Sequence, residues 1–223
     1  MKIYCDGACS GNPGAGGWAF QVHYDNGIIR EFGGREDDIT TNNRMELTAV
    51  IKSMEYAHQQ FETVEDLQAA RVEIISDSKY VIQGATEWLM LWRKRQFCKA
   101  DGERIENEDL WRTLSSLNPE VFIFNWVKGH NGTNCQERVD QLACDLSRNK
   151  PVQFFYGRPN KQPDRHYPLY LVFRSEDNQI QRFKTWDECQ RAVSGVKNIH
   201  FKKVSNSFQE EEQLRAWGFK EIS

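Results

Sequence analysis

Patterns of apolar and polar residues divide the first 150 residues into nine predicted elements. Residues 2–9, 18–24 and 28–33 predict three sequential strands, with Asn26-Gly27 as a hairpin turn. From Asn43 onward the apolar positions recur at helical spacing, which predicts a first helix. The other predicted elements are strands at 72–76 and 122–127 and helices at 86–97, 107–117 and 135–147.

The order of these elements indicates the fold class. Three strands followed by helices and strands in alternation predict an α/β fold with a mixed sheet flanked by helices. Residues 10–17, SGNPGAGG, are rich in glycine and contain a proline, so we expect a loop between the first two strands.

The rest of the chain predicts a second, smaller domain. Strands are expected at 169–174, 179–184 and 199–204, and helices at 187–193 and 208–217, giving a small three-stranded sheet with two helices. Four of the six prolines fall between residues 149 and 168. We therefore predict domains at 1–148 and 167–223 joined by a linker at 149–166, although the aromatic residues 154–156 are expected to pack on a domain.

Composition places the chain among soluble globular proteins. Apolar residues make up 39%, charged residues 27%, and the mean hydropathy is -0.71. No segment is long and apolar enough to span a bilayer, and the N-terminus lacks the apolar core of a secretory signal. We expect a cytoplasmic protein that does not engage membranes, with six reduced cysteines, since no CxxC pair is present.

Charge differs between the two predicted parts. Residues 1–150 hold 17 Lys and Arg against 23 Asp and Glu, whereas residues 151–223 hold 12 against 9. Carboxylates in the first part suit cations, and the basic excess of the second suits a polyanionic partner.

Four carboxylates lie on four different predicted elements: Asp6, Glu46, Asp77 and Asp140. Hard divalent cations such as Mg²⁺ prefer carboxylate oxygens, and two such ions can activate water for phosphodiester hydrolysis. Most of the 32 acidic residues must simply face solvent, so spacing alone does not select this group.

The sequence motifs around these carboxylates resemble those of the ribonuclease H family, type 1. The motifs are DGACSGNPGAGG from Asp6, TNNRMEL from Thr41, SDSKYV from Ser76, VKGHNG from Val127 and ERVDQLA from Glu137. They occur in the family's order, and the resemblance covers residues 1–148.

The resemblance implies a fold and an activity. It implies a ribonuclease H-like sheet and an endonuclease that hydrolyses the RNA strand of RNA/DNA hybrids, leaving 5′-phosphate and 3′-hydroxyl ends. Asp6, Glu46, Asp77 and Asp140 would bind two Mg²⁺ ions, with Mn²⁺ as an alternative. His130 would assist turnover by moving protons, for which a side-chain pKa near 6.5 is suited. The glycine-rich loop lacks the Gly-Lys-Ser/Thr ending of a P-loop, so no nucleotide cofactor is expected.

The resemblance also implies substrate contacts. A shallow minor groove, where 2′-hydroxyl groups mark RNA, would be lined by Cys9, Gly11, Asn12, Asn42 and Asn43. Thr41 and Asn43 are candidates for a DNA-phosphate contact, and Lys79, where the family commonly has glutamine, would contact the groove or a phosphate. The same glycines and asparagines could instead serve only as turn formers.

An aromatic and basic segment resembles the family's basic protrusion, which grips the DNA strand. Its candidate residues are Trp92, Arg93, Lys94 and Arg95. The alternative is a helix that buries its tryptophans while the basic residues are solvated, and we expect a combination of both.

The C-terminal part resembles the hybrid-binding domain found at the N-terminus of eukaryotic type 1 enzymes. The matching motifs are LYLVF (169–173), TWDECQ (185–190) and HFKKV (200–204). Tyr170 would then contact DNA, Trp186 would stack on nucleic acid, and Lys202 and Lys203 would hold phosphates. The domain stands at the opposite end of the chain, and SEDNQ (175–179) replaces the usual glycine-rich turn.

These observations favour a monomeric hybrid-specific endoribonuclease with a C-terminal hybrid-binding domain. One alternative is a catalytically silent protein that binds hybrid or double-stranded RNA. A second is a nuclease that also cuts double-stranded RNA, and a third makes the C-terminal part a protein-interaction domain.

Overall fold

A computed structural model of the chain describes residues 1–129, 134–159, 168–174, 179–196, 198–205 and 207–218. His130 lies outside the described residues. The chain divides into two compact units, Met1–Pro159 and Asn160–Ser223, and each is described by itself. Among the described residues, no helix is long and apolar enough to cross a membrane.

Unit 1 is built on a six-stranded mixed sheet with the order β5-β4-β1-β2-β3-β6. β1 pairs antiparallel with β2 and parallel with β4, and β4 pairs parallel with β5. The strands are β1 (Lys2–Ser10), β2 (Gly14–His23), β3 (Ile29–Thr40), β4 (Glu73–Ser76), β5 (Ile123–Trp126) and β6 (Tyr156–Gly157). The predicted mixed sheet is confirmed.

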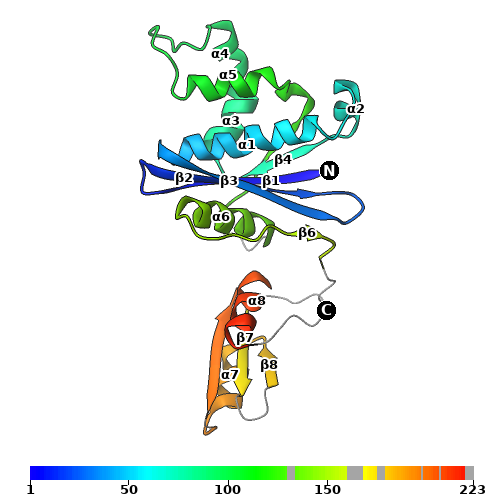
Figure 1. Cartoon of the computed structure of the whole chain (residues 1–223), viewed down its shortest axis with the longest axis vertical. Helices are drawn as coiled ribbons and strands as arrows, with labels where there is room; N and C mark the ends of the chain where they lie inside the picture. The colour runs from blue at the N-terminus through cyan, green and yellow to red at the C-terminus, as the bar shows by residue number, and fades with distance from the viewer. Residues whose placement is uncertain (130–133, 160–167, 175–178, 197, 206, 219–223) are drawn as a thin grey trace. The chain divides into compact units, whose positions relative to one another are not determined.

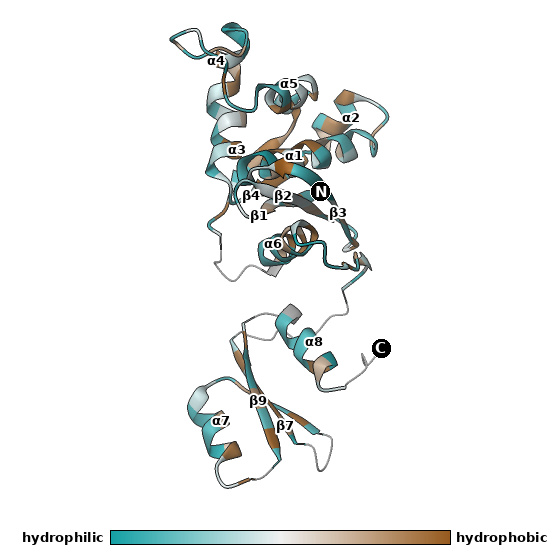
Figure 2. Ribbon diagram, turned by 60° about the vertical axis from the view of Figure 1, so that its left-hand side comes forward, coloured by the Kyte–Doolittle hydropathy of each residue, from teal (hydrophilic) through white to brown (hydrophobic). Residues whose placement is uncertain are grey.

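Helices cover both faces of this sheet. They are α1 (Asn42–His58), α2 (Val64–Ala69), α3 (Lys79–Gln83), the π-helical turn η1 (Gly84–Trp88), α4 (Leu89–Lys94), α5 (Glu108–Ser116), the 3₁₀ turn η2 (Pro119–Val121) and α6 (Asn134–Ser147). α1 packs on β1 and β2 from one side, and α6 packs on β1, β2 and β3 from the other (Figure 1). Hydrophobic residues gather where α1 meets the sheet (Figure 2), and Leu47 and Ile74 are fully buried there.

The glycine-rich segment differs from its prediction, because Gly14 to Gly17 belong to β2 and pair with β1 and β3. These glycines allow both helices to approach the sheet closely. A Cβ atom at Gly16 would lie 2.3 Å from the Met45 sulfur on α1, and one at Gly17 would lie 2.3 Å from the Ala143 carbonyl oxygen on α6. Packing, rather than a loop, accounts for the glycine content here.

The predicted helix at 86–97 is wrong in its bounds. Helical structure begins at Lys79, where the Ser78 hydroxyl accepts from the backbone N–H of Val81, and it ends at Lys94. Phe97 lies in a turn with φ 62°, and its side chain is buried. Gly84 stands inside this helical run because a Cβ atom there would lie 2.1 Å from the Trp111 ring.

The chain after α6 stays attached to unit 1 through Glu31. Glu31 accepts from Arg138 at 2.7 and 2.8 Å, from Gln21 at 2.8 Å and from the Phe155 backbone N–H at 2.9 Å. The Glu31 backbone N–H donates in turn to the Phe155 carbonyl, and β6 then pairs with β3. The aromatic segment therefore packs on unit 1, as expected.

Unit 2 contains a three-stranded antiparallel sheet with the order β8-β7-β9 and two helices, which confirms the predicted small sheet and helices. Its elements are β7 (Leu169–Arg174), β8 (Gln179–Phe183), α7 (Trp186–Val193), β9 (Ile199–Val204) and α8 (Ser207–Ala216). Leu171 and Val204 are buried, with Leu214 and Trp217 packed against this core. Thr185 and Glu188 form a capping box that starts α7.

β1 and α1 approach each other closely at Gly7. A Cβ atom on Gly7 would lie 2.1 Å from the Met45 carbonyl carbon and 2.2 Å from the Glu46 backbone nitrogen. Backbone atoms cannot rotate out of the way as the end of a flexible side chain can. The position of the first turn of α1 therefore depends on the absence of a side chain at residue 7.

We predict that Gly7→Ala displaces α1 and lowers the free energy of unfolding by at least roughly 2 kcal/mol, because the new methyl group collides with backbone. Urea unfolding followed by circular dichroism measures this loss. A variant within about 0.5 kcal/mol of the wild type, the range of a neutral surface change, would contradict the close approach.

We predict a pH-dependent loss of stability for Glu31→Gln. Burial alone would raise the pKa of Glu31, but the hydrogen bonds and charge of Arg138, together with the Phe155 and Gln21 hydrogen bonds, lower it below 4.5. A lowered pKa gives stability that is present above 4.5 and lost as the pH falls through the folded-state value. At pH 7 the variant should lose roughly 3 kcal/mol, since Arg138 is left without its carboxylate.

Urea unfolding of the wild type and of Glu31→Gln measures the difference in their free energies of unfolding. It is measured at pH 7 and at pH values below the pKa of an ordinary glutamate. The gap should narrow as the solution becomes acidic. A gap of constant size across the series would show that the ionised Glu31 carboxylate is not its source.

Candidate active site

Asp6 and Asp77 lie at the end of the parallel pairing between β1 and β4. Tyr4 is paired with Ile75, and the two carboxylates stand two residues farther along their respective segments. β1 itself continues to Ser10, so Asp6 lies within the strand. The Asp6 side chain is buried, and one of its oxygens accepts from the Gly7 backbone N–H at 2.7 Å.

Glu46 and Asp140 come from the helices on the two faces of the sheet. Glu46 lies early in α1, next to the close approach at Gly7, and accepts from the Ser78 hydroxyl at 2.5 Å. Asp140 lies on α6, half-buried, and accepts from the Cys144 thiol at 3.5 Å.

The electrostatics show that these four carboxylates act on one another. The pKa of Asp6 is raised well above its ordinary value, first by burial and then by the negative charges of Asp77, Asp140 and Glu46. Burial also raises the pKa of Glu46, with a further contribution from Asp77, although the Ser78 hydrogen bond opposes this rise. The fold therefore concentrates negative charge around one buried carboxylate.

The donor set fits hard divalent cations. Within the described residues, no three His, Cys, Asp or Glu side chains are arranged to hold a metal ion as they stand. Mg²⁺ is commonly held by only one or two carboxylates, with water and substrate phosphate completing its shell. The mutual repulsion recorded in the raised pKa of Asp6 is what a bound cation relieves.

The segment that leads to His130 passes Asp77. A Cβ atom at Gly129 would lie 2.5 Å from an Asp77 carboxylate oxygen. His130 itself lies outside the described residues, so its predicted role stays a prediction.

The predicted groove residues lie together beside β1. The Cys9 backbone N–H donates to the Asn42 side-chain oxygen at 2.8 Å, and the Asn42 backbone N–H donates to the Asn12 side-chain oxygen at 3.3 Å. Gly11 lies in the intervening turn with φ 87°, a conformation that favours glycine. These hydrogen bonds hold the turn against the start of α1, so part of the hydrogen-bonding capacity of these residues is used within the protein.

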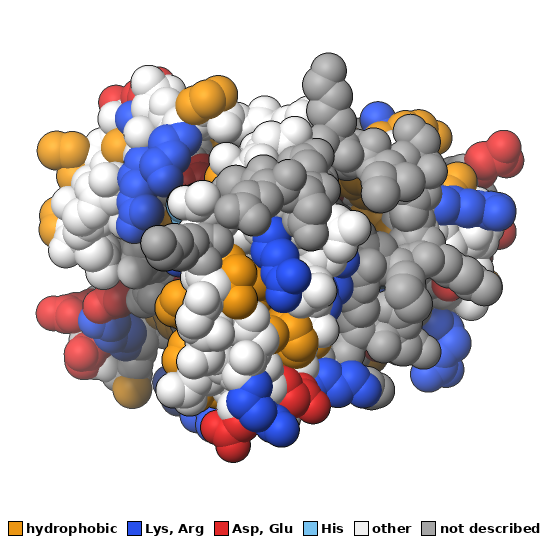
Figure 3. Space-filling model, turned by 90° about the horizontal axis from the view of Figure 1, so that it is seen from below, with side chains coloured by type: hydrophobic (Ala, Val, Ile, Leu, Met, Phe, Trp, Pro, Cys, Tyr) orange, Lys and Arg blue, Asp and Glu red, His pale blue; other side chains and the backbone are white. Residues whose placement is uncertain are grey.

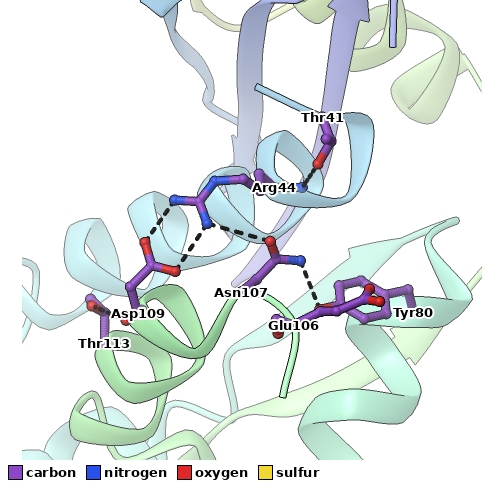
Figure 4. A network of polar contacts seen from close by, with 7 residues as sticks. All are labelled: Thr41, Arg44, Tyr80, Glu106, Asn107, Asp109 and Thr113. Carbon is purple, nitrogen blue, oxygen red and sulfur yellow. Dashed lines mark hydrogen bonds and ion pairs between the residues drawn. The ribbon is translucent and has the colours of Figure 1, made fainter. Parts of the chain in front are cut away.

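Thr41 and Asn43 line a pocket of about 390 Å³ that also includes Asn12, Glu106 and Asn107. A polar network fixes the side of this pocket formed by α5 (Figure 4). Arg44 donates to both Asp109 oxygens at 2.6 and 2.9 Å and to the Asn107 oxygen at 3.3 Å.

Tyr80 completes this network. The Asn107 amide donates to the Tyr80 hydroxyl at 3.0 Å, and the Trp111 indole donates to the same hydroxyl at 2.8 Å. The starts of α1 and α5 are thereby tied together around the pocket.

Lys79 is exposed at the start of α3, with its ammonium group 5.1 Å from the centre of the Trp126 ring. The Trp126 indole donates to the Asp77 carbonyl oxygen at 2.9 Å. Lys79 therefore lies near the candidate site, because it contacts Trp126, which is hydrogen-bonded to Asp77. Its predicted contact with nucleic acid stays a prediction.

The basic segment is partly used inside unit 1. The Trp92 ring packs between Trp88 and Trp111, at 5.6 and 5.0 Å between ring centroids. Arg93 donates to the Ser115 hydroxyl and carbonyl oxygens at 2.6 and 2.7 Å. Lys94 and Arg95 are exposed at the end of α4, so these two remain available for a phosphate.

Unit 2 gathers aromatic side chains and one lysine on the face of its sheet that α7 covers in part. The Trp186 ring lies 5.6 Å from Tyr170 and 5.5 Å from Phe201, and the Lys203 ammonium lies 5.8 Å from the Tyr170 ring. We call Tyr170, Trp186, Phe201 and Lys203 the aromatic patch. Basic and hydrophobic side chains stand side by side on the face of the molecule drawn in Figure 3.

Lys202 does not belong to the aromatic patch. Neighbouring residues of a strand point to opposite faces, so Lys202 shares its face with Val204 and its paired residue Leu171. The two lysines predicted to hold phosphates are thus separated by the sheet.

Several residues near these sites were not indicated by the sequence patterns. Asn107 lines the pocket at Thr41, Phe201 belongs to the aromatic patch, and Gln136 contacts Asp6 and Asp77. Alternation along the predicted strand could have placed Phe201 on the face of Lys203. No local pattern distinguishes Asn107 or Gln136, because their neighbours come from distant parts of the chain.

Comparisons with known proteins agree with this geometry. The family model for RNase H matches residues 1–148. The chain is 45% identical over 146 residues to a ribonuclease H of Nitrosomonas eutropha, covering 64% of this chain and 86% of that one. It is 42% identical over 159 residues to a ribonuclease H of Methylobacillus flagellatus, covering 71% and 95% of the two chains.

Solved structures show the same fold. LC9-RNase H1, a type 1 RNase H with the type 2 active-site motif, is 28% identical with a TM-score of 0.54, covering 70% of this chain and 76% of its own. The foamy viral protease-reverse transcriptase in complex with RNA/DNA hybrid is 18% identical with a TM-score of 0.52, covering 66% of this chain and 20% of its own. The family match extends over strands β1 to β5 and the four candidate carboxylates of unit 1, and the chain belongs to the ribonuclease H family.

Proposed function

We propose a mechanism for this ribonuclease H, a nuclease of the hydrolase class. We propose that Asp6, Glu46, Asp77 and Asp140 hold two divalent cations, Mg²⁺ or Mn²⁺, with which the enzyme cuts the RNA strand of RNA/DNA hybrids. The products would carry 5′-phosphate and 3′-hydroxyl ends. We further propose that unit 2 binds the hybrid.

One observation carries the catalytic part of this proposal: carboxylates from the sheet and from the helices on its two faces gather around Asp6, whose pKa is raised by burial and then by the charges of Asp77, Asp140 and Glu46. A cluster that only maintained the fold would gain nothing from like charges placed near one another, since their repulsion disfavours the ionised forms. A binding site for cations gives the cluster a purpose. When bound, two divalent cations activate the attacking water and stabilise the leaving oxygen.

The protein's own residues have distinct tasks in this scheme. Asp6 and Asp77 supply ligands from the sheet, whereas Glu46 and Asp140 supply them from the helices on its two faces. The Ser78 hydroxyl orients Glu46. His130 would move protons to and from the reacting groups, as its ordinary pKa allows.

The polar surface around the carboxylates supports a hybrid as substrate. Cys9, Asn12 and Asn42 form a connected set beside β1, suited to the 2′-hydroxyl groups of an RNA strand. Thr41, Asn43 and the exposed Lys94 and Arg95 would contact the phosphates of the DNA strand. These groups approach the two strands from different elements of unit 1.

The aromatic patch supports nucleic-acid binding by unit 2. Trp186 is 40% exposed and Phe201 is 52% exposed, which leaves ring surface for stacking on a base or sugar. Lys203 beside Tyr170 adds a positive charge for a phosphate. A second binding surface on the same chain raises the effective concentration of hybrid at the carboxylates.

We predict that Asp77→Asn abolishes Mg²⁺-dependent cleavage of a labelled RNA/DNA hybrid while the variant still folds and binds the hybrid. The amide keeps the shape of the side chain but removes the charge that a cation needs. Asp38→Asn is the matched control, because Asp38 is exposed on β3 and should retain full activity. Cleavage by Asp77→Asn at the rate of this control would remove the metal assignment.

We predict that Lys203→Ala weakens binding to a long hybrid and reduces the salt dependence of binding by about one phosphate contact, because Lys203 lies in the aromatic patch. Lys202→Ala removes the same charge from the other face of the strand and should do so to a smaller extent. Affinity titrations at several salt concentrations compare the two. Equal effects would show that the aromatic patch does not direct binding, and no effect from either would remove the hybrid-binding role of unit 2.

A further inference from the structure

Gln136 connects two of the four carboxylates. It lies in the first turn of α6 and is 2% exposed. Its side-chain nitrogen lies 3.3 Å from an Asp6 oxygen, 3.3 Å from an Asp77 oxygen and 3.3 Å from the Cys5 carbonyl oxygen. Three acceptors from β1 and the end of β4 thus surround one amide group.

The chemistry of these neighbours fixes the orientation of the amide. A carbonyl oxygen and two carboxylates can only accept, so the group that faces them must be the donor NH₂. The reverse orientation would place three oxygens around a fourth with no hydrogen between them. The N–H···O distances are at the long end of the usual range, as expected when two hydrogens are shared among three acceptors.

The other end of the amide is unusual. Within the described part of the chain, the buried Gln136 side-chain oxygen accepts no hydrogen bond. Leaving a buried acceptor unpaired costs free energy, typically about 1–3 kcal/mol. The protein bears this cost at residue 136, although a side chain without nitrogen or oxygen atoms, such as methionine, would fill a similar space without it.

We propose that Gln136 is a positioning residue that holds the Asp6 and Asp77 carboxylates together while no cation is bound. Its NH₂ group places partial positive charge against both carboxylates and so offsets their repulsion. The first turn of α6 adds to this effect, because a helix N-terminus carries partial positive charge. The inference rests on the proposed cation site, and it concerns the state of the enzyme before the cations arrive.

A cation brings far more positive charge than an amide. Gln136 therefore stabilises the ion-free enzyme more than the ion-bound enzyme. A ligand that binds the folded state raises its stability according to its affinity, so the two states can be compared by unfolding. Removing the amide should lower stability most in chelator, and Mg²⁺ should then restore more stability than it adds to the wild type.

The test uses the full chain and Gln136→Met, which keeps the approximate size of the side chain and removes its polar atoms. Thermal unfolding is measured in chelator and in Mg²⁺, following the transition that Mg²⁺ shifts. In chelator the variant should unfold roughly 4 °C or more below the wild type, the loss expected for hydrogen bonds to charged groups. Its upward shift in Mg²⁺ should exceed that of the wild type by about 2 °C or more.

Gln136→Glu provides a second variant of the same size. It replaces the donor by a fifth negative charge, so it should be less stable than Gln136→Met in chelator and show the largest shift in Mg²⁺. Gln21→Met is the matched control, because Gln21 is also buried but donates to Glu31, on the network that attaches β6. Gln21→Met should lose stability equally in chelator and in Mg²⁺.

A Mg²⁺ shift of Gln136→Met equal to or smaller than that of the wild type would overturn the inference, because a merely structural role lowers both unfolding temperatures alike. That outcome leaves the cation site standing if the wild type is stabilised by Mg²⁺ and Asp77→Asn is not. Absence of any Mg²⁺ shift in the wild type would overturn both the inference and the proposed cation site.

Discussion

The repulsion among four carboxylates is the constraint on which unit 1 depends. Asp6 is buried, and Asp77, Asp140 and Glu46 each raise its pKa further. A fold can maintain such a cluster only if packing elsewhere compensates for its cost. The apolar core of unit 1 provides this compensation, because it buries large apolar side chains such as Leu47, Met54 and Trp111.

The carboxylate site forms because the backbones of the helices α1 and α6 approach the sheet closely. Gly7 lets α1 contact β1 at Glu46, and Gly17 lets α6 approach β2 on the other face of the sheet. The parallel pairing of β1 with β4 then places Asp6 and Asp77 beside each other. Carboxylates from distant parts of the chain are thus brought together by features of the backbone.

Much of the fold could be predicted from the sequence. Periodicity identified the mixed sheet of unit 1 and each strand and helix of unit 2, because these elements bury regular apolar faces. It missed α2, whose one buried side chain is Leu67, and it missed β6, which is held by Glu31 and not by an apolar pattern. It also mistook the glycines of β2 for a loop, because the helices packed against Gly16 and Gly17 are invisible to local sequence.

The sequence predicted the four carboxylates of the candidate site but not the residues that surround them. The motifs of the family resemblance indicated Asp6, Glu46, Asp77 and Asp140 together, and the structure shows that these residues interact electrostatically. The residues around them depend on tertiary contacts. Gln136 and Asn107 acquire their neighbours only when α6 and α5 pack, and Lys202 and Lys203 differ only when β9 takes its place in the sheet.

The two units divide the proposed work between chemistry and binding. Unit 1 carries the four carboxylates and the polar residues beside β1, and the family match ends within it, at residue 148. Unit 2 exposes aromatic rings and a lysine and carries none of the four carboxylates. Its basic excess contrasts with the acidic excess of residues 1–150, which suits a part that meets a polyanion.

Incubating the full chain with one labelled sequence, prepared as RNA/DNA, RNA/RNA and DNA/DNA duplexes, in Mg²⁺ and in chelator tests most directly whether the carboxylates act through a cation on an RNA/DNA hybrid. We expect cleavage only of the RNA strand of the RNA/DNA duplex and only in Mg²⁺, with 5′-phosphate ends on the products. Cleavage that persists in chelator would contradict the role of the carboxylates. Cleavage of RNA/RNA at a similar rate would contradict the choice of substrate.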